Sequence, residues 1–293
     1  SIKLVFCHIT FALFQIRTRD GYELLTGWFH TYVHHTVVPR DHKTVHIDAL
    51  DGEYEDEYSC FPPPVGMIII SIIEVATFLY DYLNTGDSHS VNGPSASVLI
   101  YDPHRRKEAW RFLCYMLVHV GWLHLILNLI IQVALGIPLE MVHGWWRIFI
   151  VYSAGVILGS LGTSVADPNV FLAGASGGVY ALITAHLATL IMNWSEMQFA
   201  WVQLIIFVIV CGTDIGSNVY NFVHSVDTNI GHAAHLGGAV AGLLVGLFVL
   251  RNLEVRSWEK KICLVAVVIY SILMIGAIVL HISAPGYFPY QSV

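Results

Sequence analysis

Residues 119–139 read HVGWLHLILNLIIQVALGIPL, a stretch long and apolar enough to cross a bilayer as one helix, which takes about 20 residues. The whole chain shares this character, because hydrophobic residues make up 56% of its 293 residues and charged residues only 12%. A water-soluble domain usually carries about 25% charged residues, since its surface has to be solvated. The composition therefore predicts an integral membrane protein of several spans, and the net charge of −7 argues against a nucleic-acid partner.

Seven apolar runs of this kind follow residue 64. They are Val65–Leu83, Val118–Leu139, Ile148–Val165, Val170–Met192, Ala200–Tyr220, Ile230–Leu250 and Ile262–Ile282. Each is expected to be a helix, because an unpaired backbone group in lipid costs several kcal/mol. The predicted fold is an all-α polytopic membrane protein whose membrane domain covers residues 65–283, followed by a short tail at 284–293.

Residues 1–64 form a separate, more polar region that ends in the three prolines at 62–64. It contains the adjacent pair His34 and His35 and the acidic run DGEYEDEY at 51–58. The two histidines could bind a metal, but solvated side chains are the simpler interpretation, and the acidic run lacks the ligand spacing of a calcium loop. We therefore expect a solvated N-terminal region without a metal site.

Basic residues predict the orientation of the chain. The link between the sixth and seventh runs carries Arg251, Arg256, Lys260 and Lys261, and Arg147 lies by the link between the second and third. Both links share a side with the N-terminus, so the positive-inside rule places all three in the cytoplasm. The basic residues between Arg105 and Arg111 oppose this assignment, because their loop would lie on the other side.

Polar residues are costly at bilayer depth and therefore need a reason, and three clusters of them stand out in the runs. The second run has His119, His124 and Asn128, the fourth has Ser176 in GASGGVY at 174–180, and the sixth has His232 and His235 in GHAAHLGGAVAG at 231–242. These three runs cross in the same direction, so their N-terminal ends share one face. Ser176 lies about six residues into its run, roughly 9 Å deep, and His235 and Asn128 are expected at a similar depth.

A hydroxyl, an imidazole and an amide in one layer suggest nucleophilic catalysis. A serine is a weak nucleophile until a neighbouring imidazole takes its proton, and Ser176 with His235 supplies that pair. Asn128, His124 and the backbone amide of Ser176 are donors that could stabilise an oxyanion.

The glycines around these residues suggest close helix packing. Gly177 and Gly178 follow the serine, and Gly238 and Gly242 follow the histidine at the spacing of one helical turn. Small residues let membrane helices approach closely, which a hydrogen bond between Ser176 and His235 on two helices requires.

Other interpretations of the polar residues remain open. They could line the path of a transporter or channel, although the two halves of the chain show no repeat. Carboxylates well inside the runs are nearly absent, with Glu74 as the exception, and Asp214 at the outer end of the fifth run is interpreted as a boundary residue. His119 and His124 could bind a metal, but no acidic or cysteine partner is expected at their depth. The GASGG sequence also fits the nucleophile elbow of soluble hydrolases, which requires a strand that this sequence lacks.

Taken together, these motifs resemble those of the rhomboid intramembrane serine proteases. The resemblance covers roughly residues 60–280. It is carried by four motifs: Trp110-Arg111, H-x4-H-x3-N from His119 to Asn128, GASG at 174–177, and AH-x2-G-x3-G from Ala234 to Gly242. Order and spacing match the family, and we find no departure at a catalytic position. A catalytically dead relative is a further alternative, but such proteins typically lose the serine or the histidine, and this chain keeps both.

The resemblance implies roles for individual residues. Ser176 would be the nucleophile and His235 the general base, as a dyad without an aspartate, with His124, Asn128 and the Ser176 amide as the oxyanion hole. Tyr180 would pack on the catalytic imidazole. The supporting positions of the motifs are His119, Gly174, Gly177, Gly238 and Gly242, together with Trp110 and Arg111, which would be structural residues of the first loop. No cofactor and no metal are implied.

The resemblance also implies a biological setting. Six core spans plus a C-terminal seventh, with a cytoplasmic N-terminal region, are similar to the animal secretase-type subgroup, as are the prolines at 62–64 and GIPLEMVHGWWR at 136–147. The expected substrates are single-pass membrane proteins cut in or near their spanning helix within the lipid bilayer, with growth-factor precursors of the epidermal-growth-factor type as one class. The expected location is the Golgi, endosomal or plasma membrane.

Overall fold

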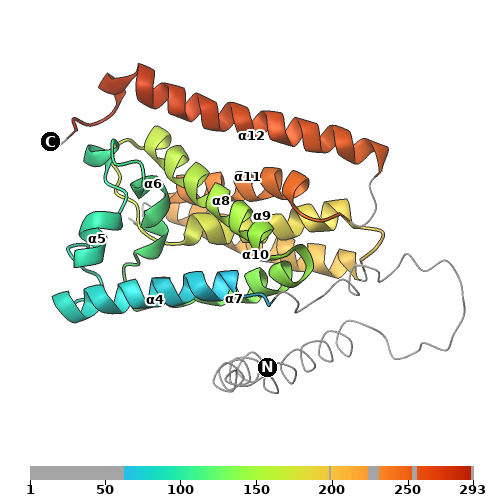
Figure 1. Ribbon diagram of the computed structural model, residues 1–293, viewed down its shortest axis with the longest axis horizontal. Coiled ribbons are helices and arrows are strands. Elements are labelled where there is room, and N and C mark those ends of the chain that lie inside the picture. The colour runs from blue at the N-terminus through green and yellow to red at the C-terminus, as the bar shows by residue number, and fades with distance from the viewer. Residues whose placement is uncertain (1–62, 198, 224–230, 253–255, 292–293) are drawn as a thin grey trace, which may run out of the picture.

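The computed structural model describes residues 63–291 except 198, 224–230 and 253–255 (Figure 1). His34, His35 and the acidic run at 51–58 lie outside the described residues. Seven long helices make up most of the described part: α4 (Gly66–Thr85), α7 (Trp122–His143), α8 (Trp145–Ala166), α9 (Ser176–Met192), α10 (Ala200–Val223), α11 (His232–Val249) and α12 (Ser257–Ser283). They confirm the prediction of an all-α polytopic membrane protein.

Short elements lie in the loops. These are α5 (Pro94–Leu99), η1 (Pro103–Arg105), α6 (Arg111–Cys114) and η2 (Tyr115–Leu117) in the first loop, and η3 (Pro285–Tyr287) after α12. In the described ranges, extended pairing is limited to one antiparallel bridge between Tyr101 and Leu172. The first loop is thus built into the fold rather than being a simple connection.

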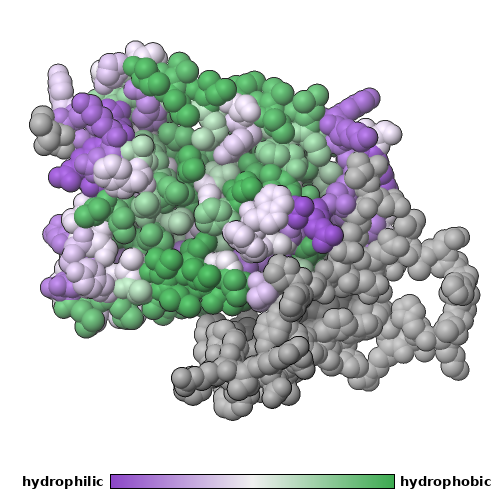
Figure 2. Space-filling view, viewed as in Figure 1, coloured by the Kyte–Doolittle hydropathy of each residue, from purple (hydrophilic) through white to green (hydrophobic). Residues whose placement is uncertain are grey.

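Five of the long helices, α4, α7, α8, α11 and α12, are long and apolar enough to cross a membrane, while α9 is a shorter apolar helix. Figure 2 shows hydrophilic side chains gathered at the two ends of the bundle and a hydrophobic band between them. Large apolar side chains such as Leu264 and Ile272 of α12 are exposed in this band, as expected for a surface that faces lipid tails.

The helices that carry His124 and Ser176 both begin later than expected. The helix of the second run begins at Trp122 rather than Val118, because Gly121 has a φ of +87° that does not fit a helix. The fourth run was expected to be helical from Val170, but α9 begins only at Ser176. Residues 170–175 are not helical because Leu172 pairs with Tyr101 instead. Ser176 is therefore the first residue of its helix, and the depth counted along a continuous helix from Val170 does not apply.

The centre of the bundle is formed by α8, α9 and α11, with α12 along the outside against α11 and α8 (Figure 1). Glycines let the central helices touch. A Cβ atom on Gly155 of α8 would lie under 3.0 Å from the Ala181 side chain of α9, and one on Gly159 would lie 2.9 Å from the carbonyl oxygen of Ala234 in α11. In lipid, such close backbone approach is a main source of helix association.

Polar side chains fasten the outer helices to this centre. The fully buried carboxyl of Glu74 in α4 lies 3.1 Å from the hydroxyl of Tyr152 in α8 and 3.2 Å from the amide nitrogen of Gln132 in α7. Gln132 also bonds the Tyr152 hydroxyl at 2.7 Å and the Ser71 hydroxyl at 2.9 Å. Glu74, the carboxylate that the sequence left without a role, therefore joins three helices.

A second carboxylate holds the start of α4. The Glu140 side chain near the end of α7 accepts hydrogen bonds from the backbone amides of Gly66 at 3.0 Å and Met67 at 2.6 Å. First-turn amides of a helix have no intrahelical acceptor, so this carboxylate satisfies groups that lipid cannot.

Glu74→Ala is expected to lower the free energy of unfolding by about 1–3 kcal/mol, because buried partners on Tyr152 and Gln132 lose their hydrogen bonds. Glu74→Gln should cost less, since its amide keeps an acceptor and supplies a donor. Ile73→Ala, a neighbouring lipid-exposed change, is the matched control. Unfolding in detergent micelles measures all three, and equal stability of Glu74→Ala and the control would contradict the fastening role.

Candidate active site

Ser176 lies where an extended segment turns into a helix. It is the first residue of α9, and Gly174 two residues earlier has a φ of +115°, a conformation that side chains rarely adopt. A Cβ atom on Gly174 would also lie 2.8 Å from the Nε2 atom of His124. Gly174 is therefore required both for the turn into α9 and for the close passage of the backbone beside His124.

Three backbone contacts hold the segment before Ser176. Leu172 exchanges hydrogen bonds of 3.0 and 3.1 Å with Tyr101, and the Gly174 amide donates to the Tyr115 carbonyl oxygen at 3.2 Å. The Ala175 amide donates to the Nε2 atom of His119 at 3.3 Å. His119 is thus a buried anchor of this segment, a contact that explains a polar side chain at this depth.

The polar face of α7 lies beside the same segment. The imidazole of His124 contacts Gly174, as described above, and its ring centroid is 5.3 Å from that of His119. Asn128, one turn further along α7, is buried, and its side-chain amide donates to the His124 carbonyl oxygen at 2.8 Å. His124 and Asn128 share one helix face, as the sequence predicted.

Helices α9 and α11 touch through their backbones. A Cβ atom on Gly238 would lie under 3.0 Å from the carbonyl oxygen of Gly177, and one on Gly242 would lie equally close to the carbonyl oxygen of Ala181. Ser176 adjoins Gly177, and His235 precedes Gly238 by one turn. The contact therefore brings the serine and the histidine within about one helical turn of each other on two adjacent helices.

The imidazole of His235 stacks on the ring of Tyr180, with centroids 4.3 Å apart and an angle of 17° between the planes. Tyr180 lies one turn after Ser176 on α9, so the stack fixes the His235 ring against the helix that carries the serine. Ser176, Tyr180 and His235 are all half-buried. These three side chains therefore lie within the helix bundle but keep part of their surface accessible.

Two tyrosines that the sequence did not single out fill the space behind the glycines of α9. The fully buried Tyr115 donates its hydroxyl to the Val156 carbonyl oxygen at 2.9 Å, and a Cβ atom on Gly177 would lie 2.9 Å from that hydroxyl. The Tyr152 ring lies equally close to the Cβ position of Gly178. The glycines signal a close approach in the sequence, but nothing there identifies the side chains that approach.

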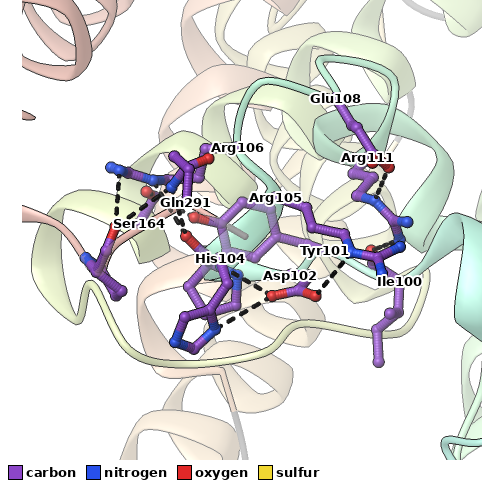
Figure 3. Close-up of polar contacts among 12 residues, drawn as sticks. Ile100, Tyr101, Asp102, His104, Arg105, Arg106, Glu108, Arg111, Ser164 and Gln291 are labelled. Carbon is purple, nitrogen blue, oxygen red and sulfur yellow. Dashed lines mark hydrogen bonds and ion pairs between the residues drawn. The ribbon is translucent and has the colours of Figure 1, made fainter. Parts of the chain in front are cut away.

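Trp110 and Arg111 lie in the first loop rather than beside Ser176. Arg111 is only 2% exposed and donates to the Glu108 carboxylate at 2.6 Å, to the Ile100 carbonyl oxygen at 2.9 Å and to the Ser97 carbonyl oxygen at 3.1 Å (Figure 3). Trp110 is half-exposed, and its ring nitrogen lies 3.4 Å from the Val98 carbonyl oxygen. All these partners belong to the first loop, so Trp110 and Arg111 stabilise the fold of that loop.

The arrangement combines a hydroxyl at a helix N-terminus, a fixed imidazole on an adjacent helix and a buried side-chain amide nearby. The first amides of α9 lack an intrahelical acceptor and point toward incoming negative charge. Within the described ranges, no group of three His, Cys, Asp or Glu side chains is placed to hold a metal ion. Such a site suits acyl transfer to a serine.

Comparison with known proteins gives the family. A model of the Rhomboid domain matches residues 106–252, half of the chain. The match includes Trp110, Arg111 and the three helices that carry the candidate site residues, α7, α9 and α11. The chain belongs to the rhomboid family. Rhomboid-related protein 3 of Homo sapiens is 41% identical over 240 residues, covering 79% of this chain and 59% of that protein, and rhomboid-related protein 2 of Mus musculus is 42% identical over 200 residues, covering 66% of each.

Family membership does not by itself establish activity for this rhomboid. Inactive rhomboid-related protein 2 of Caenorhabditis elegans is 35% identical over 236 residues, covering 79% of this chain and 65% of that protein. This rhomboid chain also spans less than two thirds of the length of the Homo sapiens relative.

Gly238→Ala is expected to separate α9 from α11 and to lower the free energy of unfolding of this rhomboid by about 1–3 kcal/mol, the cost of overpacking a tight contact. The matched control is Gly276→Ala on α12, where a Cβ atom meets nothing within 4 Å. Unfolding in detergent micelles measures both. A Gly238→Ala protein as stable as the Gly276→Ala protein would show that the helices do not touch here.

Proposed function

We propose that this rhomboid is an intramembrane serine endopeptidase that uses Ser176 and His235 as a catalytic dyad. The observation that carries the proposal is the backbone contact of α9 and α11 at Gly177 and Gly238, with His235 stacked on Tyr180 one turn from the serine. A helix pair held this closely can keep a hydroxyl and an imidazole within hydrogen-bond reach, which activation of a serine requires.

In the first step, His235 takes the proton of the Ser176 hydroxyl as its oxygen attacks the carbonyl carbon of the scissile bond. The carbonyl oxygen becomes an oxyanion in the tetrahedral intermediate and needs donors at once. Asn128 can serve because its amide carries two hydrogens, of which the His124 carbonyl takes one. His124 and the Ser176 amide are the other proposed donors.

In the second step, the intermediate collapses, and the C–N bond of the substrate breaks as His235 returns the proton to the leaving amine. The acyl group stays on Ser176 as an ester. Water then attacks this ester with His235 again as the general base, which releases the acid product and restores the serine. Because Tyr180 stacks on the imidazole, we assign it the task of keeping the ring oriented through both proton transfers.

We further propose that the substrates are single-pass membrane proteins cut in or near their spanning helix. The site lies in a bundle that has a hydrophobic band on its outer surface (Figure 2), so a substrate would reach it from the bilayer. Attack at a peptide carbonyl needs an extended backbone, so helix-weakening residues near the scissile bond should favour cleavage. Release of growth-factor precursors of the epidermal-growth-factor type is the proposed physiological output.

The proposed setting is a Golgi, endosomal or plasma membrane, with residues 1–64 in the cytoplasm. The basic residues beside the links after α7 and α11 support this orientation through the positive-inside rule. The proposal includes no metal and no cofactor, since the serine, the imidazole and the amide donors suffice for hydrolysis.

Ser176→Ala and His235→Ala are each expected to lower the cleavage rate of a tagged single-pass reporter at least about a thousandfold, because the two residues act as one unit. The matched controls Ser90→Ala and His89→Ala, both in the loop between α4 and α5, should cleave like the wild type. Quantification of the released fragment measures all four. Equal product from the wild type and both dyad variants would contradict the protease and would leave a protein that binds membrane clients without cutting them.

Asn128→Ala is expected to lower kcat by an amount that corresponds to about 3 kcal/mol, the usual value of one oxyanion donor, while KM changes little because the donor acts in the transition state. The loss should be smaller than for Ser176→Ala, since His124 and the Ser176 amide remain. Steady-state cleavage of the same reporter gives both constants. A raised KM with unchanged kcat would assign Asn128 to substrate binding instead.

A further inference from the structure

The end of the chain is attached to the first loop. The Arg106 guanidinium donates to the Pro289 carbonyl oxygen at 3.3 Å and lies 4.1 Å from the centroid of the Phe288 ring. The Gln291 amide donates to the Pro103 carbonyl oxygen at 3.3 Å and accepts from the Lys107 backbone amide at 3.4 Å. Figure 3 shows Arg106 and Gln291 together at this junction.

A chain of side-chain hydrogen bonds lies beneath this attachment. The Tyr101 hydroxyl lies 2.7 Å from the Ser164 hydroxyl at the end of α8, and Ser164 lies 2.8 Å from the Nε2 atom of His281 near the end of α12. The Nδ1 atom of His281 is 2.7 Å from the Ala277 carbonyl oxygen, which can only accept. Nδ1 therefore carries the proton, Nε2 accepts from Ser164, and Ser164 accepts from Tyr101.

Aromatic rings surround this chain. The His281 ring stacks on Phe288 with centroids 4.4 Å apart and meets the edge of Phe112 at 5.6 Å. Phe112 in turn packs against Tyr101 at 5.0 Å, and the Tyr287 hydroxyl bonds the Val165 carbonyl oxygen at 2.8 Å. We call His281, Tyr287, Phe288, Pro289 and Gln291 the C-terminal clamp, because together they contact the first loop and the end of α8.

The loop residue that the clamp holds is also the one that pairs with the segment before the serine. Tyr101 forms the bridge to Leu172, which lies two residues before Gly174 and four before Ser176. Its side chain belongs to the hydrogen-bond chain and its backbone to the bridge. A displacement of Tyr101 would thus also displace Leu172 and the segment that leads from it into α9.

We propose that the C-terminal clamp positions the active site, with His281 and Ser164 as positioning residues that act through Tyr101 on residues 172–175. Helix α12 lies outside the central bundle (Figure 1). According to this proposal it supports catalysis through His281 and is more than an added membrane anchor. The inference deepens the proposed function, because the reaction it serves is the one assigned to Ser176 and His235.

Cleavage kinetics and hydrogen exchange test the clamp together. His281→Ala and Ser164→Ala are each expected to lower kcat for the reporter about tenfold with KM within about twofold, and to speed amide exchange in residues 170–176 about tenfold, as expected when buried hydrogen bonds are lost and a segment opens locally. Tyr290→Ala is the matched control, because this neighbour of the clamp is 97% exposed and should change neither quantity.

A double variant adds a sharper test. If Ser164 and His281 act in one chain, the combination of both alanines should cost no more in kcat than either alone, whereas independent sites would multiply their effects. Tyr101→Phe keeps the ring and removes only the hydroxyl, so it should show the same loss with the folded fraction unchanged. Multiplied effects, or an unchanged kcat in Tyr101→Phe and Ser164→Ala, would overturn the proposal.

The two readouts separate this proposal from the proposed function. Faster exchange at residues 170–176 in His281→Ala, with no cleavage by the wild type, would support positioning by the clamp and refute the protease. Cleavage that depends on Ser176, with exchange and kcat in His281→Ala equal to those of Tyr290→Ala, would support the protease and refute the clamp.

Discussion

The backbone contact between α9 and α11 is the constraint on which the candidate site depends. At Gly177 and Gly238 no side chain intervenes, so the two helices approach as closely as backbones can. The proposed catalytic dyad is tied to this contact, since Ser176 begins one helix, His235 lies a turn before the contact on the other, and the Tyr180 ring stacks on the His235 ring. Lipid offers no hydrophobic force to bring helices together, and small residues replace it with close packing.

Around this contact, polar bonds hold elements that packing alone would leave loose. Glu74 joins α4 to α7 and α8, Glu140 satisfies the first amides of α4, and His119 anchors the segment before the serine. Each of these groups would be costly in lipid without its partner. The intramembrane polar residues of this rhomboid therefore fall into two sets, a few proposed for chemistry and others that fix the positions of helices and loops.

Much of this architecture could be predicted from local pattern. The apolar runs gave seven helices, and the glycines beside Ser176 and His235 indicated a close helix contact. The sequence could not show that residues 170–175 are not helical, because they are apolar enough for a helix and the partner of Leu172, Tyr101, lies about 70 residues earlier. It could not identify Tyr115 and Tyr152 behind the glycines or the C-terminal clamp, since contacts between distant segments leave no spacing to detect.

His235 is proposed to activate Ser176 across the contact of α9 and α11. The most direct measurement is treatment of the purified protein in micelles with a fluorophosphonate, followed by peptide mass spectrometry to locate the adduct. We expect a single adduct on Ser176 in the wild type and almost none in His235→Ala, because a serine without its base reacts slowly. An adduct on another serine, or equal labelling of Ser176 in His235→Ala, would contradict it.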